Sequence, residues 1–288
     1  MKELILNADD FGLTKGVNEG IIHAFRDGVL TSTTLMANGP AFEDAVRYAL
    51  ANRKLGVGCH LVLAGGTPVS SPTDIPSLVD KSGRLPASLG LFVAKVSTGA
   101  IRTKDIEREL RAQIQKIRDA GIEPTHLDTH KHTHAHPRVM NVLANLAQEL
   151  GITRVRKPAE YLSDSWTQMC GESGASPKQF AAVAAVRVIS ANFASISKKY
   201  GLRSPETFLG VAATGQLGPE ALCDLIDRLP EGRTEIMLHP GVCDEDLAKT
   251  GSRLQRQRQL ELDGLLAPQV RRAIEHHGIR LISYRELN

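Results

Sequence analysis

Residues 122–137 read IEPTHLDTHKHTHAHP and hold five of the ten histidines of the chain. The histidines and one aspartate all occupy even-numbered positions, namely His126, Asp128, His130, His132, His134 and His136. Because residues two apart on an extended segment point to the same face, we expect His126, Asp128 and His130 to form a polar row at a strand end. Pro124 favours an extended approach to this row, and Pro137 is suited to begin the next helix.

This histidine-rich stretch is a candidate metal site. Neutral imidazole and carboxylate groups are the usual protein ligands of zinc and similar divalent ions. The alternatives are a histidine-rich loop in solvent or an expression tag, but a tag would lie at a terminus and this stretch is internal. The sequence predicts one divalent metal ion, with zinc favoured and magnesium, manganese and cobalt left open.

Around this stretch, short apolar or β-branched segments alternate with amphipathic segments. The pattern predicts strands near 4–6, 29–37, 55–63, 152–157, 207–212, 234–239 and 279–283, and helices near 16–27, 42–51, 104–120, 138–150 and 219–229, with helical stretches between 252 and 277. Alternation of strands and helices indicates an α/β fold with a parallel sheet or a (β/α) barrel. We expect one barrel domain over residues 1–288.

Two segments depart from this alternation, at about 64–100 and 159–206. The first is rich in Gly, Pro and Ser and is expected to cross the rim of the barrel, with a short helix near 88–97. The second is a predicted helical insertion whose central part, FAAVAAVRVISANFASISKKYG from residue 180, is rich in alanine. It is interpreted either as packed helices of a subdomain or as an apolar wall or lid over an apolar substrate.

Candidate catalytic residues lie where predicted strands end. Asp9 and Asp10 follow the first strand, His60 lies in the third, and His239 ends a later one. In (β/α) barrels such positions meet at one face. One aspartate can then bind a metal while the other acts as a base, and His239 suits a general acid. The alternatives are that either aspartate caps a turn and that each histidine is structural.

Composition limits the classes of function. The chain has 288 residues, 42% hydrophobic and 23% charged, with a net charge of +3. This small surplus, without a recognisable nucleic-acid motif, does not predict nucleic-acid binding. Four scattered cysteines, no signal-like N-terminus and no run of eighteen apolar residues lead us to expect a cytoplasmic protein. The sequence leaves a homodimer open.

Several motifs together resemble one family. ILNADDFGLTKGVNEGI near the start, TSTTLMANGPAF, GVGCHLVL, PTHLDTHKHTHAHP, MLHP and the closing GIRLISYREL are similar to the YdjC-like carbohydrate deacetylases. The resemblance implies a distorted (β/α) barrel of the glycoside hydrolase/deacetylase type and metal-dependent removal of an N-acetyl group from an amino sugar. It also implies that Asp10, His60 and His130 hold the ion, with Asp9 as base and His239 as acid.

The substrate is the least determined part of the expectation. The chain is most similar to the hopanoid-biosynthesis-associated branch, which implies N-acetylglucosamine on a hopanoid glycolipid and a protein peripheral to the inner membrane. Substrate contacts are expected from Asp128, His134, Arg156 and Lys157. The alternatives are a soluble chitooligosaccharide deacetylase and a metal-dependent sugar-binding protein without turnover. The spare carboxylate of Asp9 favours an enzyme, and the lack of a basic, glycine-rich phosphate cradle disfavours phosphoester hydrolysis.

Overall fold

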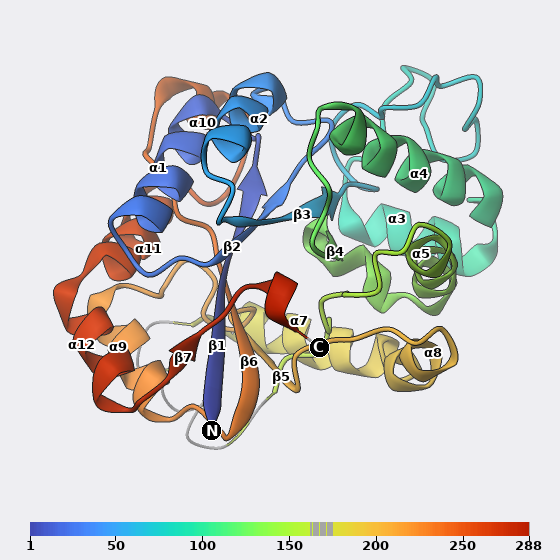
Figure 1. Cartoon of the computed structure of the whole chain (residues 1–288). Coiled ribbons are helices and arrows are strands. Elements are labelled where there is room, and N and C mark those ends of the chain that lie inside the picture. Colours follow the sequence, from blue (N-terminus) through green and yellow to red (C-terminus); the bar gives the residue numbers. More distant parts are fainter. Residues whose placement is uncertain (162, 164–166, 168–170, 172–174, 288) are drawn as a thin grey trace.

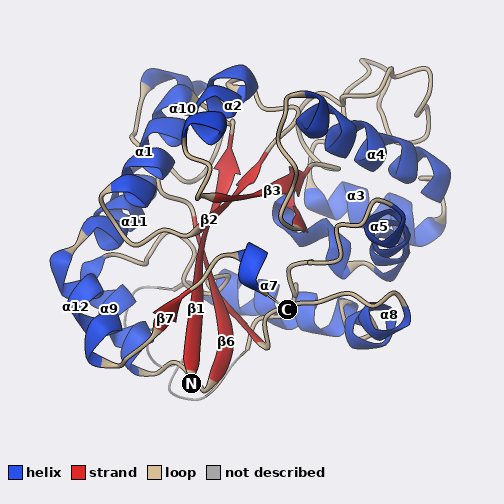
Figure 2. Cartoon of the chain, in the orientation of Figure 1, coloured by secondary structure: helices blue, strands red, loops and turns tan. Residues whose placement is uncertain are grey.

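A computed structural model describes the whole chain except residues 162, 164–166, 168–170, 172–174 and 288. Its centre is a parallel sheet in the order β4-β3-β2-β1-β6-β5, with β7 also paired to β1 (Figures 1 and 2). The strands are β1 (Lys2–Phe11), β2 (Ser32–Leu35), β3 (Gly56–Leu61), β4 (Leu127–Thr129), β5 (Thr207–Leu209), β6 (Gly232–Leu238) and β7 (Arg280–Leu281).

Strand β1 is the central strand of this sheet. It pairs with β6 along residues 2–8, with β7 near its start and with β2 toward its end. Leu4, Ile5 and Leu6 are completely buried, as expected for a continuous apolar run covered on both faces. β1 therefore delivers Asp9 and Asp10 to the middle of the edge formed by the carboxyl ends of the strands.

The sheet closes into a distorted barrel through irregular bridges. Between β4 and β5, single parallel bridges join Leu127 to Val155 and Arg154 to Arg203. The prediction of a regular strand at 152–157 is wrong, because this segment makes only these bridges. Pro158, which follows directly, has no N–H group and so cannot extend a ladder. The predicted distorted (β/α) barrel is confirmed.

Helices cover the sheet on its outer sides. Figure 1 shows α1, α11, α12 and α9 along one side and α3, α4 and α5 on the opposite side. The helical elements are α1 (Lys15–Arg26), α2 (Phe42–Ala51), α3 (Leu89–Thr98), α4 (Thr103–Asp119), α5 (Pro137–Glu149), α7 (Pro177–Ile189), α8 (Phe193–Lys199), α9 (Pro219–Asp227), α10 (Glu245–Lys249), α11 (Arg256–Leu266), α12 (Pro268–His276) and the 3₁₀ turns η1 (His130–Ala135) and η2 (Tyr284–Glu286). The predicted helices are confirmed, including the start of α5 at Pro137, whereas α10 and η1 were not expected.

The two irregular segments contain helices. The first includes α3, close to the helix predicted at 88–97, and the second includes α7 and α8. The rest of the predicted insertion at 159–206 falls partly on residues outside the described set, as does Cys170; Cys59, Cys223 and Cys243 are free thiols. No single helix among the described residues is long and apolar enough to cross a membrane. The bent pair α7–α8 taken together has the length and apolar composition of a membrane span.

Gly58 in β3, two residues before His60, lies very close to the His126 residue that precedes β4. A Cβ atom at Gly58 would lie 2.5 Å from the His126 ring and 2.7 Å from the His126 carbonyl oxygen. The His126 ring in turn stacks on Tyr284 with a centroid distance of 3.6 Å. A side chain at position 58 would therefore push β3 away from β4 or displace this stack.

We predict that Gly58→Ala destabilises the protein by about 1–3 kcal/mol, the usual cost of overpacking a filled interior. The measurement is the midpoint of urea unfolding followed by circular dichroism. Gly90→Ala is the matched control, since a Cβ there meets nothing within 4 Å and alanine favours a helix by up to about 1 kcal/mol. Equal stability of Gly58→Ala and the wild type would contradict the packing described.

Candidate metal centre

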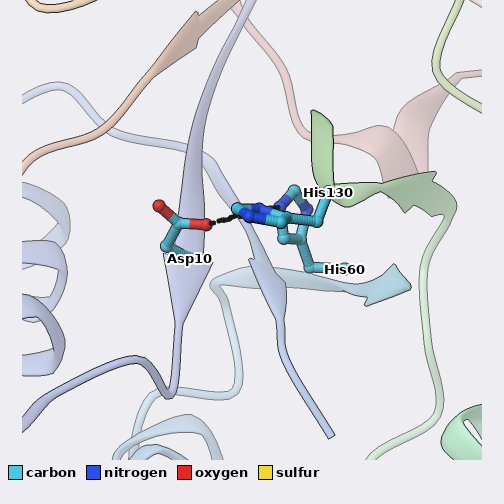
Figure 3. Close-up of side chains that lie close together, drawn as sticks. All are labelled: Asp10, His60 and His130. Atoms are coloured by element: carbon cyan, nitrogen blue, oxygen red, sulfur yellow. Dashed lines mark hydrogen bonds and ion pairs between the residues drawn. The ribbon is translucent and has the colours of Figure 1, made fainter. Parts of the chain in front are cut away.

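Three ligand-type side chains converge at the carboxyl edge of the sheet (Figure 3). Asp10 comes from β1, His60 from β3 and His130 from η1. Asp10 Oδ1 lies 3.4 Å from His60 Nε2 and 3.3 Å from His130 Nδ1, and the two ring nitrogens are 3.3 Å apart. The structure thus brings together the three residues that the family resemblance implied.

The spacing of these atoms suits a small divalent ion. Ligands at about 2.0–2.1 Å in a tetrahedral arrangement stand roughly 3.3–3.4 Å apart, so the three observed separations describe one face of such a tetrahedron. Asp10 Oδ1 is buried and makes no hydrogen bond of normal geometry within the described part of the chain. An oxygen and two imidazole nitrogens facing one point, with a fourth direction left for other ligands, fit a catalytic rather than a structural centre.

The turn after β1 holds Asp10 in place. Asp10 has φ of 67°, a left-handed conformation that costs energy for a residue other than glycine. Its carbonyl oxygen accepts the N–H of Leu13, and the Asn18 side chain accepts the N–H of Gly12 while donating to the Ala41 carbonyl. These bonds fix the turn, so the strained carboxylate remains directed at the two histidines.

Arg258 completes the environment of Asp10. Its guanidinium donates to Asp10 Oδ2 at 2.6 Å, and both groups are buried. Burial alone would raise the pKa of Asp10, but Arg258 and the neighbouring histidines hold it well below its ordinary value. Asp10 is therefore ionised, with Oδ2 bound by arginine and Oδ1 left for the metal site.

His60 is oriented by Asp128. His60 Nδ1 lies 2.9 Å from Asp128 Oδ1, which fixes the ring so that Nε2 faces Asp10 and His130. Burial by itself lowers the pKa of His60, yet the carboxylates of Asp128 and Asp9 raise it to about 10. A negative field that favours a proton on Nε2 also favours a metal cation there, and binding would release that proton. A carboxylate behind a ligating histidine is the usual support in metal sites.

The turn η1 positions His130. Lys131 and His132 both have positive φ, at 57° and 52°, and reverse the chain directly after His130. Thr129 Oγ1 accepts the backbone N–H of His134 and lies 2.7 Å from its Nδ1. This closed turn leaves the His130 side chain 27% exposed, so it is the most accessible of the three candidate ligands.

The remaining histidines of the stretch have other surroundings. His126 is not part of the three-residue cluster: its Nδ1 lies 2.9 Å from Thr125 Oγ1 and its ring stacks on Tyr284. His132 packs edge-on against Phe208. His136 accepts the N–H of Arg138 and so caps α5. Alternation in sequence therefore does not produce a common ligand face, because the strand ends at Thr129.

Asp9 lies beside the three ligands but is bound differently. Arg156 donates to both of its carboxylate oxygens at 2.7 Å, and Asn7 donates at 3.0 Å. Burial would raise the pKa of Asp9, but the charge of Arg156 and neighbouring histidines lower it. Thr34 Oγ1 lies 3.4 Å from Asp9 Oδ1 and 3.1 Å from His60 Nδ1, which links this carboxylate to the metal site.

Arg156 is the buried cation that joins these carboxylates. It is completely buried and also contacts Asp128 Oδ2 at 2.5 Å and Glu235 Oε1 at 2.8 Å. Four carboxylates, when ionised (Asp9, Asp10, Asp128 and Glu235), face two guanidinium groups (Arg156 and Arg258), which leaves two negative charges in excess once His60 has released its proton. A divalent cation would balance them.

The residues predicted to contact substrate are bonded to protein groups here. Asp128 and Arg156 are buried in the network just described, and His134 is buried with Nε2 3.0 Å from the Arg156 carbonyl oxygen. Lys157 donates to the Glu206 carbonyl at 2.8 Å. Asp128, His134 and Arg156 are therefore placed to hold other side chains in position. That any of the four residues contacts substrate directly stays a prediction.

His239 follows β6 and lies near the same carboxylates. Its ring Nδ1 is 3.8 Å from Glu261 Oε2 and has no hydrogen-bond partner among the described residues. Burial lowers the pKa of His239 to about 4. Glu261, which is completely buried, accepts the backbone N–H groups of His239 and Gly215, and burial raises its pKa to about 7. His239 is thus neutral at pH 7 in the free protein.

Sequence reasoning missed Arg258, Glu235, Glu261 and Tyr284. Tyr284 donates to Glu235 Oε2 at 2.5 Å and thereby extends the network to the last segment of the chain. Glu235 had a detectable signal, since it is an acidic residue inside the apolar strand β6. Arg258 and Glu261 had none, because the leucines and polar residues of α11 are mixed around the helix and mark no distinct buried face.

The fold and the site together define a (β/α)-barrel protein with a candidate centre for one metal ion. The profile described as YdjC-like protein matches residues 3–276, and the chain belongs to this family. It is 38% identical over 283 residues to a carbohydrate deacetylase of Geobacillus stearothermophilus, covering 98% of this chain and 96% of that relative. It is 35% identical over 287 residues to a chitooligosaccharide deacetylase of Klebsiella pneumoniae (strain 342), covering 99% and 98%.

A solved structure shares the architecture. The crystal structure of a protein described as a cellobiose-phosphate cleavage protein from Enterococcus faecalis V583 aligns with a TM-score of 0.80 and 28% identity. The alignment covers 99% of this chain and 98% of that chain. The overall fold of this chain is therefore similar to one observed experimentally.

We predict that His130→Ala removes the metal site while leaving the fold intact. The wild type should bind about one divalent ion per chain by elemental analysis, and ion at a thousandfold excess over its Kd should stabilise it by about 4 kcal/mol in thermal unfolding. His130→Ala should lose both effects. His136→Ala is the control, since His136 caps α5 and should keep them. Retention of the ion by His130→Ala would contradict the assignment.

Proposed function

We propose that this chain is a metal-dependent N-deacetylase that hydrolyses the acetamide of an N-acetylglucosamine unit. One observation carries the proposal: a cluster of Asp10, His60 and His130 with metal-ligand spacing lies beside a second carboxylate, Asp9, that is outside the cluster. Relatives that match nearly the full chain are named carbohydrate deacetylase and chitooligosaccharide deacetylase, which supports the reaction class.

The chemistry follows from the positions of the charged groups. A divalent ion held by Asp10, His60 and His130, with zinc favoured, would polarise the amide carbonyl and lower the pKa of the attacking water. Asp9 orients that water and accepts its proton. The two bonds from Arg156 keep the Asp9 carboxylate ionised and fixed, at the expense of basicity. Asp128 keeps His60 in the tautomer that presents Nε2.

His239 is the group proposed to protonate the leaving nitrogen. Its ring is neutral at pH 7, so it becomes an acid only after it takes up the proton that Asp9 has accepted from the water, which it then gives to the leaving nitrogen. The carboxylate of Glu261, 3.8 Å from Nδ1, stabilises the resulting imidazolium. An amide needs such a proton, because an amine anion is a very poor leaving group.

For the substrate, we propose N-acetylglucosamine attached to a hopanoid lipid. The support is the similarity of the sequence motifs to the hopanoid-associated branch and the alanine-rich helix α7. A lipid-linked substrate requires transient contact of the protein with a membrane surface. The second candidate is a soluble chitooligosaccharide, and the relatives with that name favour it.

Replacement of each adjacent aspartate should separate base from ligand. We predict that Asp9→Asn retains the metal and loses about 10²- to 10⁴-fold in kcat, the usual contribution of a general base. Asp10→Asn should instead lose the metal under chelator washing, and excess ion should restore part of the rate. Acetate release and metal content are measured on the same samples. Because the Asp9→Asn variant would present a neutral amide to Arg156, thermal unfolding must verify that it is folded.

The opposite pattern would exchange the two roles, with Asp9→Asn losing the ion and Asp10→Asn retaining it. Full activity of Asp9→Asn would exclude Asp9 as the base and direct attention to His239. Sugar binding without acetate release by the metal-loaded wild type would indicate a binding protein rather than an enzyme.

The substrate prediction is tested by direct comparison. Purified wild type is incubated with N-acetylglucosaminyl hopanoid and, separately, with chitobiose, and acetate release gives kcat/KM for each. We predict at least a tenfold preference for the lipid-linked sugar, because the apolar part would contribute binding energy. A preference for chitobiose would instead establish the soluble alternative.

A further inference from the structure

Positive charge is concentrated in one segment of the chain. Between Ala175 and Pro205 the sequence contains no acidic residue and five basic ones, namely Lys178, Arg187, Lys198, Lys199 and Arg203. The whole chain has a net charge of +3, so the remainder is net acidic. The segment with α7, α8 and the turn after them therefore carries a larger net positive charge than the whole chain.

Helix α7 has an inner face that is firmly attached to the barrel. Val183 is 1% exposed, and Gln179 donates to the carbonyl oxygens of Ala212 and Thr214. Arg187 donates to the Glu160 carbonyl. After a bend of 45°, α8 continues with Phe193 and Ile196 buried. The helix pair is thus a fixed part of the surface.

The outer face of α7 is apolar and exposed. It consists of Ala181, Ala182, Ala185 and Val188, spaced as neighbours on one side of a helix. Val188 is 77% exposed, the largest value among the exposed large hydrophobic residues after Met1. Lys178 precedes this face by one turn, and Lys198 and Lys199 on α8 are also exposed. The strip is made of small side chains and one valine, so the neighbouring basic residues would supply most of its attraction to an anionic membrane surface.

We propose that the outer face of α7, together with Lys178, Lys198 and Lys199, docks on an anionic membrane surface. The proposal rests on the lipid-linked substrate proposed above and adds the place of contact. Two partners could cover this face, a second copy of the chain or a membrane, and charge distinguishes between them. In a twofold dimer through this face, the same basic segment would meet itself, and its cations would repel one another. Anionic lipid headgroups instead attract each of them.

Helix α7 lies close to the candidate metal site, so membrane contact there would bring a lipid-linked substrate near that site. α7 packs against η1, the turn that carries His130. A membrane on the outer face of α7 would be separated from that turn by about one helix diameter, roughly 10–12 Å. A sugar can span such a distance while its lipid remains in the bilayer, so docking here would present the acetamide to the ligands.

The test is flotation with phosphatidylcholine vesicles that contain or lack phosphatidylglycerol. Wild type should bind only the anionic vesicles, and less as salt is added. The variant Lys178→Glu/Lys198→Glu/Lys199→Glu should bind roughly a hundredfold or more weakly, since each surface lysine contributes about fivefold. The matched control Lys54→Glu/Lys81→Glu/Lys104→Glu has the same change in charge on exposed residues outside the segment and should bind nearly as wild type. Val188→Asp should also weaken binding.

Activity on a soluble sugar separates this proposal from the proposed function. The α7–α8 variant should release acetate from chitobiose at the wild-type rate, because none of its three lysines belongs to the metal site. No binding of wild type to anionic vesicles, or equal loss in variant and control, would overturn the docking surface even if acetate release persists. A wild-type dimer in sedimentation that the variant abolishes, without vesicle binding, would also overturn it and assign the face to a second copy. Absence of acetate release from every substrate would instead reject the deacetylase.

Discussion

The site depends on one buried guanidinium group. Arg156 is completely buried and binds the carboxylates of Asp9, Asp128 and Glu235, which come from three different strands. Loss of a partner from a buried ion pair costs about 3–5 kcal/mol, and here three carboxylates would lose their counterion at once. Arg156 therefore joins β1, β4 and β6 directly beside the candidate metal centre, and through Asp128 it supports the orientation of His60.

The same arrangement explains how two adjacent aspartates acquire different roles. Both lie in the irregular stretch of β1 between Ala8 and Phe11, where Asp9 is bound by Arg156 and Asp10, with positive φ, turns toward His60 and His130. Arg258 neutralises the far oxygen of Asp10, so only one oxygen faces the histidines. The strain at Asp10 is maintained by the bonds of Asn18 and by the central position of β1, consistent with strain at a functional position.

The candidate metal centre and the surface of α7 and α8 carry charges of opposite sign. With His60 deprotonated, the candidate metal centre has two negative charges in excess, whereas the segment from Ala175 to Pro205 carries five basic residues and no acidic one. A divalent ion suits the former, and anionic lipid suits the latter. The two regions meet where α7 packs against η1, which links the proposed docking surface to the proposed chemistry.

The sequence alone determined the alternating barrel, the helices with a clear apolar face, and the adjacency of Asp9 and Asp10 at the end of a buried strand. These features are local, because periodicity and turn residues act within a few positions. Tertiary structure decided which histidine of five reaches the metal site and which cations bind the aspartates. Arg156 is 147 positions from Asp9 and Arg258 is 248 positions from Asp10. Such pairs form only when the barrel closes, and no local pattern specifies them.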